Sequence, residues 1–226
     1  MKLSKIALPS ILSLIPVLAL AAPLAAEQGW TFQASLGGAN SVDSRLTLRQ
    51  EGLEDLKVDA SWDSKPFTDP VYYSVRAGRW SGRGGWELEL VHHKLYLRNP
   101  PPEIESLEIS HGYNLVMINR GWDLGRFLVR AGAGPVVAHV EGAARGRQLD
   151  KGGYQWTGPA VQIGAEKRIA LRRSWLLGIE GKISAARAVI PIRGGELDAP
   201  NVAGHLLVSF GYRWRSGPAD PPADPL

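Results

Sequence analysis

The sequence predicts an all-β protein, an eight-stranded antiparallel up-and-down transmembrane β-barrel. Three observations predict this fold: a removable secretion signal, recurring segments that alternate between apolar and polar side chains, and connections that alternate between short and long. The chain has 226 residues, with 26 Gly, 16 Pro, 8 Trp and no Cys. Because a secreted chain without cysteine has no disulfides, a closed barrel with every backbone group paired is the expected source of its stability.

Residues 1–26 have the pattern of a signal peptide. Lys2 and Lys5 precede an apolar run at 6–20, and the small residues at 19–21 form a cleavage site, with 25–26 as a second candidate. Removal of the two lysines lowers the formal net charge from +4 to +2. The basic character of the chain is therefore no indication of nucleic-acid binding.

The mature chain alternates with the period of a β-strand. In 175–184, Ile179 and Ile183 share one face while Glu180 and Lys182 share the other. Most such segments have about ten residues, the length of a tilted membrane-crossing strand. They recur at 30–37, 71–80, 86–97, 107–118, 126–138, 154–166, 175–186 and 203–214.

The connections support the same topology. The short ones are expected at 81–85, 119–125 and 167–174, and the longer ones, rich in Pro, Gly and charge, at 98–106, 139–153 and 187–202. Short turns face the periplasm in such barrels, and long loops face outward.

The two ends of the mature chain complete this topology. Residues 38–69 are expected to form a long first outer loop with a hairpin extension, and the last strand ends on alternating aromatics up to Trp214. The barrel is therefore assigned to 27–214, and 215–226 is expected to be a disordered Pro-rich tail.

All five histidines fall toward the outer ends of the expected strands: His92, His93, His111, His139 and His205. One interpretation is that they are interfacial side chains; the other is a site at the outer rim, facing the lipopolysaccharide leaflet. Cationic and hydrogen-bonding neighbours that would suit a phosphorylated sugar headgroup are Tyr72, Tyr73, Arg76, Lys94, Tyr96 and Asn114.

The facing of two histidines is left open by the sequence. If Glu87 and Glu89 point into the barrel, alternation sends His92 and Lys94 outward, unless a bulge lies near Val91. Alternation places His111 on the same strand face as its apolar neighbours. Deeper in the barrel, opposed charges are expected to form a structural network: Arg76, Arg130, Lys182, Glu87, Glu89 and Glu180.

Several catalytic motifs are absent from the sequence. There is no Gly-x-Ser-x-Gly elbow, no His-Glu-x-x-His, no phosphate-binding loop and no cysteine metal site. Ser110 and His111 are neighbours, but neighbours on a strand face opposite ways, so they are no evidence for a hydrolytic pair.

Taken together, several motifs resemble a family of small proteobacterial outer-membrane barrels that includes the lipid A oxidases. The matching pieces cover most of the mature chain: Pro70-Val71-Tyr72-Tyr73 with Arg76, His92-His93-Lys94-Leu95-Tyr96, His111-Gly112-Tyr113-Asn114, Gly132-Ala133-Gly134, His139-Val140-Glu141, Gly158-Pro159, Glu180-Gly181-Lys182 and His205.

The resemblance implies oxidation of the proximal glucosamine of lipid A, with molecular oxygen as acceptor and a divalent cation. The implied catalytic residues are His92, Lys94, His111, Asn114, His139, Glu180, Lys182 and His205. The implied substrate-binding residues are Tyr72, Tyr73, Arg76 and Tyr96, and the implied metal ligands are His139 and Glu141.

Other functions remain open at this point. The resemblance implies a monomer in the outer membrane of a Gram-negative bacterium, with the lipid bilayer and lipopolysaccharide as its partners and no nucleic acid. One rival is a non-catalytic structural or adhesion barrel of the OmpA or OmpX kind. The other is a hydrolytic lipid A deacylase, which is disfavoured because the sequence offers no convincing Ser-His-acid set.

Overall fold

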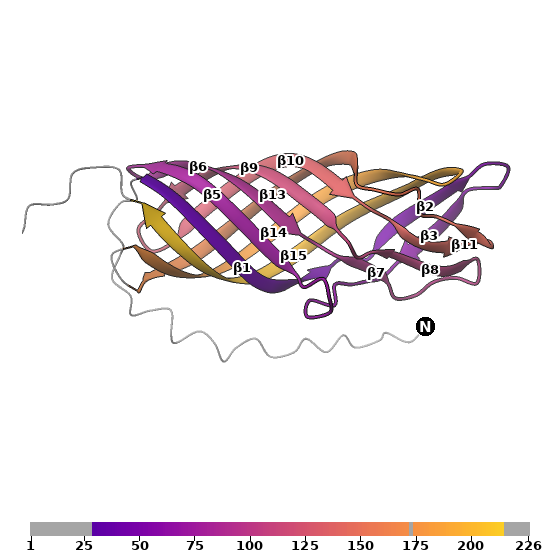
Figure 1. The fold of residues 1–226 in the computed structure, drawn as a ribbon, viewed down its shortest axis with the longest axis horizontal. Helices are drawn as coiled ribbons and strands as arrows, with labels where there is room; N and C mark the ends of the chain where they lie inside the picture. Colours follow the sequence, from indigo (N-terminus) through magenta and orange to yellow (C-terminus); the bar gives the residue numbers. More distant parts are fainter. Residues whose placement is uncertain (1–28, 172–173, 215–226) are drawn as a thin grey trace, which may run out of the picture.

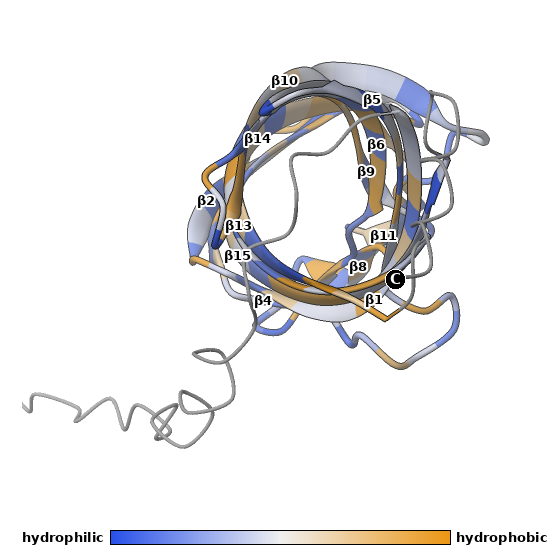
Figure 2. Ribbon diagram, turned by 90° about the vertical axis from the view of Figure 1, so that its left-hand side faces the viewer, coloured by the Kyte–Doolittle hydropathy of each residue, from blue (hydrophilic) through white to orange (hydrophobic). Residues whose placement is uncertain are grey.

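The computed structural model describes residues 29–171 and 174–214. The expected signal peptide at 1–26 and the expected Pro-rich tail at 215–226 lie outside these residues. Eight antiparallel strands close into a barrel, because β1 pairs with β5 on one side and with β15 on the other (Figures 1 and 2). The barrel strands, in spatial order, are β1 (Gly29–Ser41), β5 (Tyr73–Ser81), β6 (Gly84–His92), β9 (Tyr113–Asp123), β10 (Leu128–Ala138), β13 (Gln155–Ala170), β14 (Trp175–Ile192) and β15 (Gly195–Trp214).

The predicted fold class and strand number are confirmed. The turns between β5 and β6, β9 and β10, and β13 and β14 are short and lie together at one end, where β15 ends (Figure 1). The long connections lie at the other end. No helix in the described part of the chain is long and apolar enough to cross a membrane.

The long connections are themselves built from strands, which form an outer extension of the barrel. The extension comprises the far ends of β14 and β15 together with β2 (Ser44–Gln50), β3 (Leu56–Ala60), β4 (Trp62–Asp63), β7 (Leu95–Leu97), β8 (Ile104–Ile109), β11 (Glu141–Ala144) and β12 (Arg147–Gln148). The β2–β3 hairpin adds to the edge of β15, and the other five strands form a second sheet in the order β12-β11-β8-β7-β4. The expected hairpin within 38–69 is therefore present.

Three predicted boundaries are wrong. The segment 86–97 is not one strand, because β6 ends at His92 and 95–97 form β7 of the second sheet. The segment 107–118 is not one strand: β8 ends at Ile109, and β9 begins at Tyr113. Between them Gly112 has a φ of 136°, a backbone conformation that interrupts a regular strand. The expected outer loop at 187–202 is instead the end of the β14–β15 hairpin, which stays paired up to Ile192 and Gly195.

The interior of the outer extension is apolar. Leu46 and Leu48 of β2, Ile190 of β14 and Leu197 of β15 are almost fully buried in one cluster with residues of β8 and β9. Because this part of the molecule faces water, burial of apolar side chains drives its folding as in a soluble sheet.

The interior of the membrane-spanning barrel is charged instead. Arg76 contacts Glu89 at 2.9 Å and Glu180 at 2.6 Å, and Arg130 contacts Glu87 at 2.5 Å and Glu166 at 2.7 Å. These side chains are almost fully buried. The expected network of opposed charges is present, and it includes Glu166 and Arg168, which the sequence reading did not assign to it.

Candidate functional site at the outer rim

The outer surface of the barrel is apolar over the length of its strands. The exposed aromatic side chains Trp30, Trp86, Trp122, Trp175 and Trp214 lie toward the end with the short turns. Exposed aliphatic side chains follow above them: Leu36, Leu88, Ile118, Ile163, Ile183 and Leu206. A surface of this kind, around a charged interior, is suited to a bilayer and not to water. The protein is an outer-membrane β-barrel.

The height of the outer membrane boundary follows from β9. Asn114 and Trp122 lie about eight residues apart on its outward face, roughly 27 Å along a strand and roughly 20 Å along the membrane normal at a tilt of about 40°. An apolar band of about 25 Å therefore ends near Asn114. Exposed Tyr154 and Trp156 lie at the corresponding end of β13, as expected of interfacial aromatics.

His92 faces outward at this boundary. Glu87 and Glu89 point into the barrel, and His92 takes the opposite parity and pairs with Tyr73 of β5. Its ring stacks on the Tyr73 ring with centroids 4.9 Å apart, and its Nδ1 lies 2.8 Å from Asn114 Oδ1. Because Asn114 Oδ1 is an acceptor, Nδ1 carries the proton and Nε2 keeps its lone pair. Among the described residues, buried Nε2 has no hydrogen-bond partner.

His111 and His139 meet at Glu141. The Glu141 carboxylate lies 2.8 Å from His111 Nδ1 and 3.3 Å from His139 Nε2, and Asp150 lies 3.9 Å from the same nitrogen of His139. His139 Nδ1 donates to Gly153 O at 3.0 Å. His139 Nε2 and the carboxylate would therefore face each other with lone pairs, which a proton or a cation between them would satisfy.

These five side chains, His92, His111, Asn114, His139 and Glu141, are called the rim cluster below. His, carboxylate and amide groups are donors that suit a divalent cation. Within the described ranges, however, no three His, Asp or Glu side chains are arranged as a preformed metal site.

Gly112 positions the centre of the rim cluster. Its amide oxygen accepts from the backbone NH of His139, and its φ of 136° turns the chain between His111 and Asn114. A Cβ at this position would lie 2.1 Å from Asn114 Nδ2. The glycine therefore allows Asn114 to fold back toward His92.

Lys94 does not face outward, contrary to strict alternation. It is buried and donates from Nζ to the carbonyl oxygens of Lys65 and Thr68, each at 2.8 Å. Desolvation by burial lowers the pKa of Lys94 below its ordinary value. Tyr96 lies nearby, and the Lys65 ammonium is 4.2 Å from the centroid of the Tyr96 ring. Lys94 and Tyr96 therefore both hold the loop between β4 and β5.

Tyr72 and His205 were expected at the rim, but the structure places them inside the barrel. The Tyr72 hydroxyl is hydrogen-bonded to His205 Nδ1, and Ser184 Oγ lies 2.7 Å from His205 Nε2. His93 lies beside them and contacts Asn201 Oδ1 at 3.1 Å. The sequence reading missed the Ser184–His205 pair, because the two residues come from neighbouring strands and no local motif joins them.

Arg76, Glu180 and Lys182 also lie away from the rim. Lys182 Nζ donates to Glu89 Oε1 at 2.6 Å, within the buried charge network described above. The predicted residues therefore separate into three groups: the rim cluster with Tyr73 stacked on its His92, the loop contacts of Lys94 and Tyr96, and the barrel interior.

A lipid-facing groove begins beside the rim cluster. Its volume is about 580 Å³, and it extends from Tyr73 over Ala34 of β1 toward Phe210 and Leu177. Ala34 lies between Val75 and Phe210 in the sheet, so a small side chain between larger ones forms the floor. The groove is open to the position that acyl chains occupy in the bilayer.

Comparison with solved structures finds other small barrels. The chain is similar to the attachment invasion locus protein Ail of Yersinia pestis, with 9% identity, a TM-score of 0.41, and coverage of 83% of this chain and 100% of that one. It is also similar to Neisserial surface protein A, with 10% identity, a TM-score of 0.43 and coverage of 83% and 98%. The outer membrane protein AlkL has 12% identity, a TM-score of 0.46 and coverage of 89% and 97%. No family model and no curated protein matches the chain.

Proposed function

We propose that the protein modifies lipid A in the outer leaflet, as an oxidase of the proximal glucosamine, and that the rim cluster is its active site. The observation that carries this proposal is the outward-facing His92, which is fixed by Asn114 and has a free lone pair on Nε2. Because His92 is 5% exposed and its Nε2 is buried, a lipid headgroup that arrives by lateral diffusion would reach this base when the neighbouring side chains move aside.

The proposed reaction begins at the anomeric hydroxyl of the sugar. His92 Nε2 accepts the hydroxyl proton, and the electron pair and hydrogen of the anomeric C–H bond pass to molecular oxygen. The products are a sugar lactone and hydrogen peroxide, and hydrolysis of the lactone gives the aminogluconate unit. The product thus gains one oxygen atom relative to the substrate.

His139 and Glu141 would hold a divalent cation in this proposal, and further ligands would come from water or substrate. Such a cation would supply positive charge beside the oxygen substrate. Without it, Glu141 still orients both histidine rings through the contacts at 2.8 and 3.3 Å. Asn114 fixes the tautomer of His92, which makes it a positioning residue.

The groove beside Tyr73 supports a lipid substrate over a soluble sugar. An acyl chain in this groove would bring its headgroup next to the Tyr73–His92 stack. The apolar lining favours a chain, because a chain in the groove makes van der Waals contacts with protein on more than one side.

The first test is mass spectrometry of lipid A from cells that produce the protein and cells that lack it. The expected result is a mass gain of one oxygen on the proximal sugar, which His92→Ala abolishes. The matched control is Arg45→Ala, which removes an exposed ion pair with Asp59 in the outer extension. If lipid A stays unchanged while the barrel is assembled, the oxidase proposal is wrong.

A second candidate function is an adhesion barrel. The observation that favours it is the size and order of the outer extension, which carries exposed apolar side chains such as Val42 and Leu53. The hydrolytic alternative has less support. The Ser184–His205 pair is buried, and its third member is the neutral hydroxyl of Tyr72 and not a carboxylate.

A further inference from the structure

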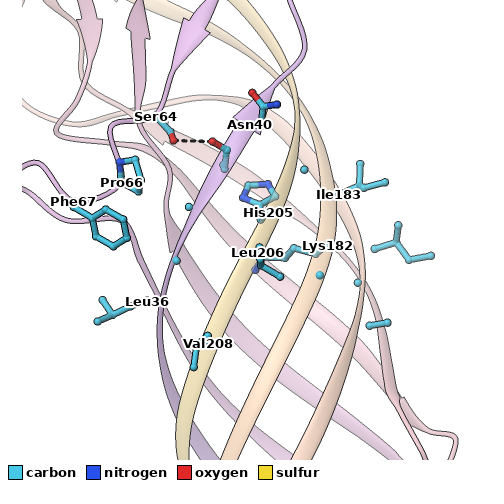
Figure 3. Close-up of a pocket in the computed structure, with 18 of the residues that line it drawn as sticks. Leu36, Asn40, Ser64, Pro66, Phe67, Lys182, Ile183, His205, Leu206 and Val208 are labelled. Atoms are coloured by element: carbon cyan, nitrogen blue, oxygen red, sulfur yellow. Dashed lines mark hydrogen bonds between the residues drawn. The ribbon is translucent and has the colours of Figure 1, made fainter. Parts of the chain in front are cut away.

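A second, larger hollow lies in the lipid-facing surface and adjoins the groove, with Leu36 and Val208 lining both. Its volume is about 1130 Å³, and it spans β13, β14, β15 and β1 (Figure 3). The hollow contains no residue of the rim cluster, whose His92 and Asn114 lie on β6 and β9. The hollow lies in the outer half of the membrane-spanning band, since it reaches Asn40 and Ser64 at its outer end.

Glycines on the outward face form its floor. Across the strands, Leu206 lies between Gly38 and Gly181, and Gly204 lies beside Ile183. Leu206 and Ile183 form the walls. A Cβ at Gly181 or at Gly204 would meet no atom within 4 Å. The space above these two glycines is therefore empty of protein, and the exposed aliphatic side chains on either side bound it.

A fixed loop covers the outer end of the hollow. Pro66 packs on Gly38, at 3.2 Å from the position of a Cβ there, and the Phe67 side chain is 85% exposed beside it (Figure 3). Lys94 holds the loop through the carbonyls of Lys65 and Thr68, and Ser64 Oγ donates to Ala39 O at 2.7 Å. An exposed phenylalanine on a loop held by these three hydrogen bonds is unfavourable in water but favourable at a membrane boundary.

We propose that this hollow binds one acyl chain of an outer-leaflet lipopolysaccharide molecule, beneath Phe67. The hollow is continuous with the lipid-facing surface of the barrel, so the occupant is part of the bilayer. Because the hollow lies in the outer half of the membrane-spanning band, its occupant comes from the outer leaflet, whose lipid is lipopolysaccharide. The hollow lies apart from the rim cluster, and its occupancy does not depend on the proposed oxidation.

The binding follows from apolar contact on several sides. A chain on a convex barrel wall touches protein on one side only, whereas a chain in the hollow touches the glycine floor, the walls of Leu206 and Ile183, and Phe67. The additional van der Waals contacts favour occupancy of the hollow over the neighbouring wall by about fivefold, which corresponds to about 1 kcal/mol.

The test places a photo-crosslinking amino acid, p-benzoylphenylalanine, at position 206 in living cells. Leu206 is 64% exposed and lies in the hollow, and the matched position is Val161, which is 54% exposed on the lipid-facing side of β13 and outside the hollow. Adducts are detected with an antibody to lipopolysaccharide, and with mass spectrometry for phospholipid. The expected yield of lipopolysaccharide adduct is about fivefold higher at 206 than at 161.

Two variants make the result specific. Gly181→Leu fills the hollow without a backbone clash and should reduce the adduct at 206 to the level at 161, while Phe67→Ala should reduce it partly. His111→Ala, which alters only the rim cluster, should leave the yield unchanged. Equal yields at the two positions, a yield that Gly181→Leu does not change in an assembled barrel, or adducts mainly to phospholipid would each overturn the proposal.

Discussion

The two interiors of this molecule have opposite chemistry although the same strands build both. Along β14, Glu180 and Lys182 point into the membrane-spanning part, and Ile190 points into the outer extension. On the outward face the order is reversed, with Ile183 in the lipid and Arg187 in water, where Arg187 pairs with Asp198 at 2.7 Å. Alternation along a strand decides which residues share a face. Whether lipid or water surrounds the sheet decides whether the outward or the inward face is apolar.

A polar layer separates the two interiors. Tyr72, His93, Ser184, Asn201 and His205 are almost fully buried there, uncharged partners between a charge network below and an apolar cluster above. Buried polar groups of this kind are stable only when they are hydrogen-bonded to each other. This layer accounts for the histidines that are not in the rim cluster.

The largest loss of stability is expected when the charged interior of the barrel loses one of its cations. Arg130→Met leaves Glu87 and Glu166 without a main cationic partner, and we expect a loss of about 4 kcal/mol in the free energy of unfolding. Denaturant unfolding in lipid vesicles measures it. Arg45→Met, which breaks an exposed pair, should cost less than about 1 kcal/mol. An equal effect of the two variants would show that the internal charges are not a network.

A cavity in the apolar interior should have a smaller and more local effect. Leu197→Ala removes a fully buried side chain from the outer extension, at an expected cost of about 3 kcal/mol. Hydrogen exchange should speed up in β2 and β15 near Leu197 and stay unchanged in β6 and β9 of the barrel. Faster exchange throughout the barrel would mean that the two interiors fold as one unit.

The outward faces can be compared directly. Ile183→Lys puts a charge into the lipid-facing surface, with an expected cost of about 2 kcal/mol. Val189→Lys lies on the same face of β14, but in the outer extension, and should cost less than about 0.5 kcal/mol. Denaturant unfolding in lipid vesicles measures both. Similar costs would place the membrane boundary further out than Asn114.

The smallest expected change in stability concerns the rim cluster. Gly112→Ala adds a Cβ against Asn114 and strains a φ of 136°, so Asn114 should move away from His92. We expect an assembled barrel, about 1 to 2 kcal/mol less stable, with at least about tenfold less modified lipid A. Quantitative mass spectrometry of lipid A checks this, with Gly146→Ala as control, since no atom lies within 4 Å of a Cβ there.

The sequence predicted the barrel because alternation is a local property. The strand at 175–186 and the charge network around Arg76 follow from which residues share a parity. The outer extension was underpredicted, because the sheet formed by β4, β7, β8, β11 and β12 pairs strands that are far apart in the chain and short.

The candidate site could be predicted only in part for the same reason. His139 and Glu141 are neighbours in the chain, and their association with His111 was suggested by their common place at the outer ends of strands. The Ser184–His205 contact, the loop-holding role of Lys94 and the inward facing of Tyr72 depend on cross-strand register and on the ends of strands, where alternation stops. A sequence alone does not contain this register.

The most direct test of the central claim is the lipid A mass spectrum of cells whose only copy carries Glu141→Gln. The substitution keeps the size of the side chain and removes the charge that joins His111 and His139. The account predicts an assembled barrel and no oxygen gain on the proximal sugar, against a clear gain in cells with the unaltered protein. An undiminished oxygen gain in the variant would contradict the assignment of the active site to the rim cluster.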